Sequence, residues 1–284
     1  DLLSRYLRFR GFHVQHVMNI TDLDDKTILG SEKAGLDLTE FARRHIEQFK
    51  KDLSVLRVRP AERYPLAGDH VKDMEVLSQK LVDKGFAYEK LRSLYFDISR
   101  FSDYGQLSGI DIQKIKLGAT VDLDAYEKEN PRDFTLFKRS RLAELKRGIF
   151  FKTKWGNVRP SWHIQCAAMS MKYLGETIDI HSGGQDLLFP HHENEVAQSE
   201  AATGKPFARY WLHNGFINVD NEKMSKSLGN FFTVREILER YQPEEVRYFI
   251  LTSHYRSPLN YADEQLDNAR AALTRLYTAL RGLE

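Results

Sequence analysis

The sequence predicts an α/β fold built on a parallel sheet. A helical pattern at 1–10 runs into a strand-like segment at 12–21, and helix, short apolar segment and helix alternate again from Ser161. A helix connected directly to a strand is half of a crossover unit, the connection that parallel strands require. The first strand of such a sheet is expected before Asp1. With 284 residues and 42% hydrophobic content, the chain can bury one large core or two modest ones.

The first predicted segment, 1–58, is one half of the sheet domain. The apolar residues of 1–10 share one face of a helix, and Gly11 stands where a helix C-terminal cap belongs. The segment at 12–21 carries valine and isoleucine among polar residues and predicts a strand, which the polar cluster Thr21–Asp25 ends.

The second predicted segment, 59–154, is an insertion in the sheet domain. A helix expected before it opens at Asp37, with Glu40 three residues later as a capping box, and a helix inside it covers about 70–84. After Gly85, turn signals separate short strand-like runs and irregular connections.

The third predicted segment, 155–220, is the second half of the sheet domain. One helix carries Cys166, and the short apolar segment 177–181 is expected to end in a glycine turn at 182–184. A further helix is expected from Pro190, because proline suits the first turn of a helix.

The last predicted segment, 221–284, opens with a lysine-containing loop. From about residue 233 it continues as two or three helices rich in leucine, tyrosine and arginine. The chain has no internal repeat and no low-complexity tract.

Composition excludes several classes of protein. The 29% of charged residues and the apolar content exclude fibrous and disordered chains. No stretch approaches the roughly 18 uninterrupted apolar residues of a membrane span, and the first residues lack the apolar core of a secretory signal. A cytoplasmic protein without a membrane partner is therefore expected. The single cysteine excludes an internal disulfide, and a net charge of +2 offers no compositional argument for nucleic-acid binding.

The densest cluster of chemically useful side chains is Phe189–Glu195. His191 and Glu195 are four positions apart, so on a helix they share one face. An imidazole and a carboxylate one turn apart suit zinc, and Cys166 could supply a thiolate from another element. The alternative is an ordinary ion pair on a solvated helix face.

A second cluster, 222–230, contains Lys223 and Lys226 with two hydroxyl groups and a glycine. Lysine ammonium groups offset the charge that develops on leaving pyrophosphate, and small residues let the backbone approach it. A solvated lysine loop is the alternative.

A third cluster lies at 181–186, at the end of the short apolar segment 177–181. Its paired glycines, Gly183 and Gly184, could let a nucleotide lie against the backbone at the carboxyl edge of a parallel sheet. A plain glycine turn explains them equally well, and His181 taken by itself reads as a hydrogen-bonded structural residue.

Taken together and in order, these segments resemble cysteinyl-tRNA synthetase, a class I aminoacyl-tRNA synthetase. The resemblance covers essentially the whole chain. Its most specific parts are the runs WHIQC at 162–166, PHHENE at 190–195 and KMSKS at 223–227, with further agreement at 19–26 and 210–216. Many class I synthetases share the KMSKS loop, but its combination with the other runs is far more specific.

The resemblance implies a Rossmann-type catalytic domain with a connective insertion and a C-terminal helical segment that contacts the tRNA stem. It implies one zinc ion held by two cysteines, a histidine and a glutamate, three of which map onto Cys166, His191 and Glu195. The other cysteine and the HIGH motif, which grips ATP in the family, are expected before Asp1. The chain is therefore expected to be truncated at both ends and inactive by itself.

The implied reaction activates L-cysteine with ATP, accompanied by Mg²⁺, and transfers it to the 3′ end of tRNA(Cys). The residues implied to line the cysteine pocket are Thr21, Trp162, His181 and Asp186. Those implied to contact ATP are Gly183, Gly184, Asp186 and the catalytic lysines Lys223 and Lys226.

Two other interpretations stay open. The cysteine ligase of mycothiol synthesis shares the fold and the zinc pocket but joins activated cysteine to an amino sugar. The run His192–Ala201 and the helical tail favour the synthetase. A truncated paralogue that binds zinc or RNA without catalysis is the other alternative. The protein is expected to be a monomer.

Overall fold

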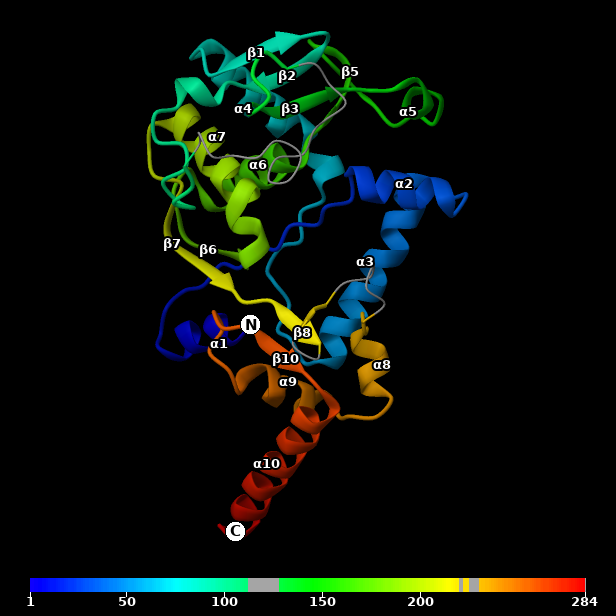
Figure 1. Ribbon diagram of the computed structural model, residues 1–284, viewed down its shortest axis with the longest axis vertical. Coiled ribbons are helices and arrows are strands. Elements are labelled where there is room, and N and C mark those ends of the chain that lie inside the picture. The colour runs from blue at the N-terminus through cyan, green and yellow to red at the C-terminus, as the bar shows by residue number, and fades with distance from the viewer. Residues whose placement is uncertain (112–127, 220–221, 225–229, 284) are drawn as a thin grey trace.

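The computed structural model describes residues 1–111, 128–219, 222–224 and 230–283. The molecule is elongated, with an antiparallel sheet at one end and helix α10, Asp263–Arg281, at the other (Figure 1). A pair of parallel strands and the helices around it lie between these ends (Figure 1).

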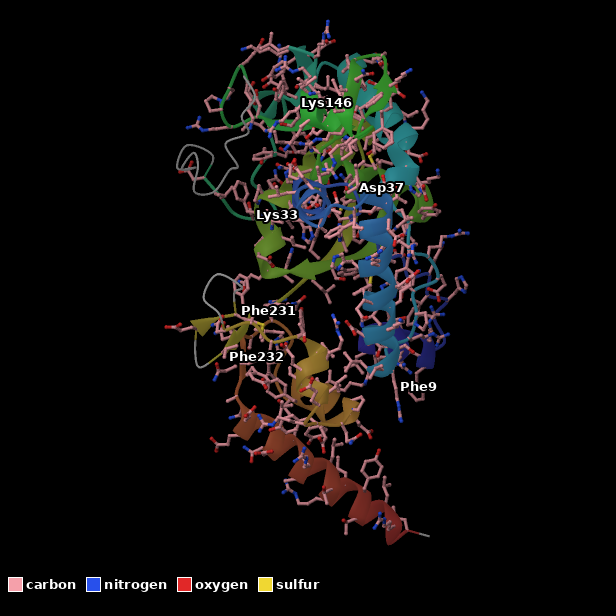
Figure 2. All side chains as sticks on the ribbon, turned by 90° about the vertical axis from the view of Figure 1, so that its right-hand side faces the viewer. Phe9, Lys33, Asp37, Lys146, Phe231 and Phe232 are labelled. Atoms are coloured by element: carbon pink, nitrogen blue, oxygen red, sulfur yellow. The ribbon has the colours of Figure 1, made fainter. Side chains whose placement is uncertain are left out.

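Three helices form the first part of the chain: α1 Leu2–Phe9, α2 Asp25–Lys33 and α3 Leu38–Val55. As predicted, α1 ends before Gly11, whose φ of +86° lies in the region that favours glycine. Asp37 caps α3, because its carboxylate accepts hydrogen bonds from the N–H groups of Thr39 and Glu40. Phe9, at the end of α1, lies at the surface and is 84% exposed (Figure 2).

One prediction for this part is wrong, and one helix was not predicted. The segment 12–21 is not a strand, because its described pairings are isolated parallel bridges at Val17 and Ile20. Helix α2 was not predicted. Its N-cap is Asp24, whose carboxylate accepts a hydrogen bond from the N–H group of Thr27 at 2.6 Å. The acidic cluster therefore starts a helix, where it was expected to end a strand.

Among the residues described in the next part, an antiparallel sheet has five strands in the order β1-β2-β3-β5-β4. Fully buried side chains of β2 and β3, such as Phe96 and Leu136, belong to one apolar cluster with Met74 and Leu81 of α4. The elements are α4 Val71–Asp83, β1 Ala87–Lys90, β2 Ser93–Phe96, β3 Phe134–Arg139, α5 Leu142–Lys146, β4 Phe151–Thr153 and β5 Gly156–Pro160, with 3-10 turns at Ala67–His70 and Ile98–Arg100.

The centre of the molecule alternates helices and parallel strands. Its elements are α6 Trp162–Leu174, β6 Ile178–Gly184, α7 Glu193–Thr203 and β7 Ala208–Asn214. β6 and β7 pair in parallel, with His181 opposite Trp211. This parallel pair, with helices α6 and α7 packed together beside it, confirms the predicted α/β class.

One local prediction in this region is wrong. The expected glycine turn at 182–184 is the end of β6, because Gly184 pairs with Asn214 of β7. The helix expected from Pro190 is present, because residues 190–192 belong to a π-helical turn that continues directly into α7. That turn, Leu188–His192, contains one extended residue, Phe189, directly before Pro190.

Where the structure describes it, the C-terminal part combines a small sheet with three helices, in agreement with the two or three helices predicted. Its further elements are β8 Ile217–Val219, β9 Glu222–Lys223, α8 Val234–Leu238, α9 Pro243–Leu251 and β10 Leu259–Tyr261. β8 pairs in parallel with β10 and antiparallel with β9. A second apolar cluster, which includes Tyr241, Phe249 and Leu266, holds this part together. Among the described helices, none has both the length and the apolar character needed to cross a membrane.

Candidate metal centre and substrate cavity

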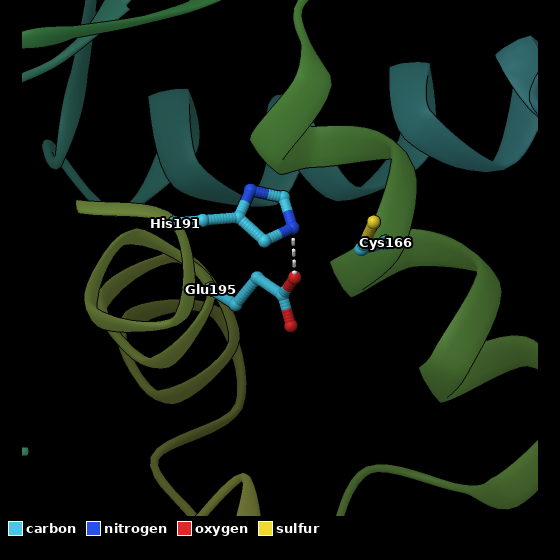
Figure 3. A group of neighbouring side chains, drawn as sticks. All are labelled: Cys166, His191 and Glu195. Atoms are coloured by element: carbon cyan, nitrogen blue, oxygen red, sulfur yellow. Dashed lines mark ion pairs between the residues drawn. The ribbon is translucent and has the colours of Figure 1, made fainter. Parts of the chain in front are cut away.

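The side chains of Cys166, His191 and Glu195 meet in the protein interior (Figure 3). Cys166 comes from α6, His191 from the turn before α7, and Glu195 from the first turn of α7. One ligand atom from each residue lies within 4.8 Å of the other two, and all three residues are buried. The structure therefore brings together the three predicted ligands, and a sulfur, an imidazole and a carboxylate form a donor set that zinc accepts.

Glu195 has one oxygen that accepts a good hydrogen bond and one that does not. Oε2 pairs with His181 Nε2 at 2.5 Å. Oε1 lies 2.7 Å from His191 Nε2, yet no described residue donates to it a hydrogen bond of acceptable geometry. Burial opposes ionisation of this carboxyl, but the neighbouring His191 and His181 outweigh burial and lower the pKa of Glu195. A buried, ionised carboxylate with an unsatisfied oxygen suits a metal ligand.

The thiol of Cys166 also fits a cation site. Asn19 Nδ2 donates a hydrogen bond to Cys166 Sγ at 3.2 Å. Burial, and after it the negative charge of Glu195, raises the pKa of the Cys166 thiol, and the Asn19 amide opposes this rise. A divalent cation beside the sulfur would reverse the preference for the thiol, because its charge stabilises the thiolate.

Aromatic rings fix the orientation of the histidines in this cluster. Trp162 stacks on His191 with ring centroids 4.1 Å apart, and His163 Nδ1 lies 2.9 Å from His191 Nδ1. His181 stacks on Trp211 with centroids 4.6 Å apart. Such outer contacts hold a ligand ring in one orientation and tune its basicity.

Sequence reasoning missed several residues of this site. His192 belongs to a second group of candidate ligand atoms with His181 and Glu195, and its Nδ1 lies 2.8 Å from His213 Nε2. The contacts of the missed residues join distant parts of the chain, so no local spacing predicts them. A signal was present in the resemblance, because all of the missed residues lie in its matching runs at 19–26, 162–166, 190–195 and 210–216. The residues missed are Asn19, His163, His192, Trp211 and His213.

A cavity of about 310 Å³ is lined by Trp162 and His163, which contact His191 of the metal cluster, but by none of the candidate ligands themselves. Of the four residues predicted to line a cysteine pocket, Thr21 and Trp162 line this cavity. His181 lies in the metal cluster, and Asp186 is exposed and is not among the lining residues. The other lining residues include Lys26, Tyr104, Phe134, His163, Pro190 and Asn194. Trp162 connects the two regions, because it lines the cavity and stacks on His191.

The two predicted nucleotide-binding glycines lie at the carboxyl end of β6. A Cβ added to Gly183 would lie 2.7 Å from the ring of His192, so glycine at this position makes room for that ring. Gly184 lies directly beside the carboxylate of Asp186. These three predicted ATP contacts therefore cluster at the edge where ligands of parallel sheets bind.

The predicted catalytic lysines belong to the segment after β8. Lys223 lies in β9, where it pairs with Asn218 of β8. Lys226 lies outside the described residues.

Comparison with known proteins assigns the family. The sequence model of the tRNA synthetases class I (C) catalytic domain matches residues 1–271. The chain belongs to this family. The curated cysteine–tRNA ligases of Caldicellulosiruptor saccharolyticus and Methanosarcina mazei are 51% and 49% identical to it over all 284 residues. The chain spans 60% of the length of each of these relatives. The predicted resemblance to cysteinyl-tRNA synthetase is thereby confirmed.

A solved structure of Mycobacterium tuberculosis methionyl-tRNA synthetase in complex with methionyl-adenylate shares the fold. It aligns with a TM-score of 0.71 over 94% of this chain and 62% of that chain, at 16% sequence identity. The predicted class I synthetase fold is therefore confirmed.

Proposed function

We propose that this chain supplies the catalytic part of a cysteine–tRNA ligase, which activates L-cysteine with ATP and transfers it to the 3′ end of tRNA(Cys). The observation that carries the proposal is the buried convergence of Cys166, His191 and Glu195 beside a cavity lined by Thr21 and Trp162. The relatives that are 51% and 49% identical are cysteine–tRNA ligases, which supports the same reaction.

Cys166, His191 and Glu195 are proposed to hold one zinc ion. The unsatisfied Glu195 Oε1 and the buried thiol both fit such an ion. Zinc would supply a borderline-soft Lewis acid that coordinates the thiolate of cysteine in preference to the neutral hydroxyl of serine. The shape of a pocket separates the binding free energies of two such similar side chains by only about 1 to 3 kcal/mol. A coordination bond that serine cannot make discriminates more strongly, so a separate site that hydrolyses wrongly activated serine is not needed.

The amino-acid substrate is proposed to lie against Thr21 and Trp162. Trp162 is 43% exposed, so part of its indole is open to a ligand while another part packs on His191. His181 is held in place by Glu195 and Trp211, which fixes its ring beside the metal cluster. Asp186, which lies outside this cavity, is assigned to the substrate ammonium group by the resemblance alone.

ATP with Mg²⁺ is proposed to bind at the carboxyl edge of β6, along Gly183, Gly184 and Asp186. A carboxylate oxygen of cysteine attacks the α-phosphorus in line, and the bond from that phosphorus to the bridging oxygen breaks as pyrophosphate leaves. Lys226, supported by Lys223, offsets the charge on the leaving pyrophosphate. A terminal ribose hydroxyl of tRNA then attacks the adenylate carbonyl and releases AMP.

The test uses the full-length protein that contains this chain, loaded with zinc. L-cysteine is expected to support ATP–pyrophosphate exchange. The kcat/KM for exchange with L-serine is expected to be lower by a factor on the order of 10⁴. Aminoacylation of tRNA(Cys) is expected to follow. Absence of cysteine-dependent exchange would overturn the proposal. Exchange followed by transfer to an amino sugar, and not to tRNA, would overturn the choice of acceptor.

A further inference from the structure

The first turn of α7 contacts a second segment of the chain, the loop Tyr104–Ser108. Glu193 is fully buried, at 0% exposed, and both of its carboxylate oxygens accept hydrogen bonds from this loop. Oε1 accepts from the N–H group of Gly105 at 2.8 Å, and Oε2 accepts from the N–H group of Ser108 at 2.8 Å. A buried carboxyl is costly unless it is hydrogen-bonded, so this pairing fixes the loop on the helix.

Asn194 makes a further contact with the same loop. Its Oδ1 accepts a hydrogen bond from the hydroxyl of Tyr104 at 2.6 Å, and both residues are buried. Burial, and after it the charges of Glu193 and Asp133, raises the pKa of Tyr104, so the hydroxyl stays protonated and donates. Tyr104 and Asn194 both line the 310 Å³ cavity. The contact therefore sets the position of one cavity wall.

The loop conformation itself is narrowly specified. Gly105 has a φ of +99°, and a Cβ added there would lie 2.7 Å from the backbone oxygen of Ile110. Glycine is therefore required for the bend that presents the Gly105 and Ser108 amides to one carboxylate.

Three consecutive residues of α7 thus have different partners. Glu193 and Asn194 hold the loop, and Glu195 belongs to the metal cluster. The geometry points to Glu193 and Asn194 as positioning residues, which hold Tyr104 as a cavity wall in fixed relation to the metal cluster. This inference rests on the proposed function, because the cavity is there assigned to the amino-acid substrate.

The test is Glu193→Gln in the zinc-loaded, full-length protein. The amide keeps the shape of the side chain but turns an NH₂ group toward a backbone N–H, so one hydrogen bond is lost. The KM for L-cysteine in pyrophosphate exchange is expected to rise roughly tenfold. The kcat is expected to change less than about twofold, and the zinc content is expected to be unchanged.

A matched control lies on the same helix. Glu200 also accepts a backbone hydrogen bond, from the N–H group of Phe207 at 2.9 Å, at the far end of α7. Glu200→Gln makes the same chemical change away from the loop and is expected to leave the KM for cysteine unchanged. Tyr104→Phe is a milder second variant, which keeps the ring, loses the hydroxyl and is expected to raise that KM a few-fold.

Hydrogen exchange of the backbone amides gives a readout that does not depend on activity. The amides of Gly105 and Ser108 are expected to exchange faster in Glu193→Gln than in the wild type, and at the wild-type rate in Glu200→Gln. If the wild type shows no cysteine-dependent pyrophosphate exchange, the proposed function fails and amide protection alone decides whether the loop is held. A folded Glu193→Gln protein with wild-type KM and wild-type protection overturns the inference. Equal rises in KM for both glutamate variants, or loss of zinc from Glu193→Gln, also overturn it.

Discussion

His191 Nε2 lies 2.7 Å from Glu195 Oε1, and the two residues are four positions apart in the chain. Their separation is a local property of the turn that leads into α7. Cys166 joins them from α6, and helices α6 and α7 pack against each other. Two ligands of the site lie on one turn, and the third lies on a neighbouring helix. The contribution of each ligand to metal binding can therefore be tested by substituting one side chain at a time.

Cys166→Ser is expected to remove zinc and the preference for cysteine together. The hydroxyl of serine is a poor zinc ligand at neutral pH, whereas the thiolate is a strong one. Metal analysis of the full-length variant and pyrophosphate exchange with cysteine and serine measure the two effects. Full zinc occupancy in the variant would contradict the assignment of Cys166 as a ligand.

Asn19→Ala is expected to weaken zinc binding by about 10- to 100-fold, the usual effect of removing a hydrogen bond to a metal ligand. The Asn19 amide stabilises the charged sulfur of Cys166, and its loss raises the pKa of that thiol further. Competition with a chelator measures the dissociation constant. Asn268→Ala, at an exposed position of α10, is the control and should bind zinc as the wild type does. Equal affinities in both variants would rule out this role for Asn19.

The metal-free protein is expected to lose stability as pH falls below about 6.5. Burial lowers the pKa of His192 to about 3 and also lowers the pKa of His163. The unfolded chain therefore takes up protons that the folded chain does not. The unfolding free energy is highest above pH 6.5 and falls toward pH 3, by up to about 1.4 kcal/mol per pH unit for each group.

Urea denaturation at several pH values measures this dependence. His192→Asn should flatten the curve between about pH 6.5 and pH 4. A curve of unchanged slope in the variant would show that His192 does not titrate in the unfolding transition.

Lys226→Ala in the full-length protein is expected to slow adenylate formation by about 10²- to 10³-fold, the typical cost of losing one group that stabilises developing charge. Cysteine binding should change much less, because the lysine is proposed to act on pyrophosphate. Lys205→Ala is the control, since Lys205 pairs with Glu176 at the surface, at 2.6 Å. An unchanged rate of cysteine-dependent pyrophosphate exchange would argue against Lys226.

Elements bounded by local signals were predictable. The end of α1 before Gly11 and the start of α3 after Asp37 follow from caps that involve only neighbouring residues. The segment 12–21 was read wrongly because strand pairing is a long-range property, and its apolar alternation leads only to isolated bridges. Pairing with β7 likewise draws Gly184 into a strand where glycine chemistry predicts a turn.

The contacts of the candidate site also divide into those that local spacing predicts and those that depend on distant segments. The spacing of His191 and Glu195 is local, and the sequence suggested their shared role. The contacts of Asn19 with Cys166 and of Trp211 with His181 depend on the packing of distant segments, so they appear only in three dimensions.

Selection of cysteine by a metal ion at Cys166, His191 and Glu195 is tested most directly by cobalt substitution. In full-length protein loaded with Co²⁺ in place of zinc, each thiolate bound to the ion adds sulfur-to-cobalt charge-transfer absorption. Addition of L-cysteine without ATP is expected to increase this absorption, and L-serine is expected to leave it unchanged. A spectrum that stays constant at saturating cysteine would mean that the substrate sulfur does not reach the ion, which contradicts selection by coordination.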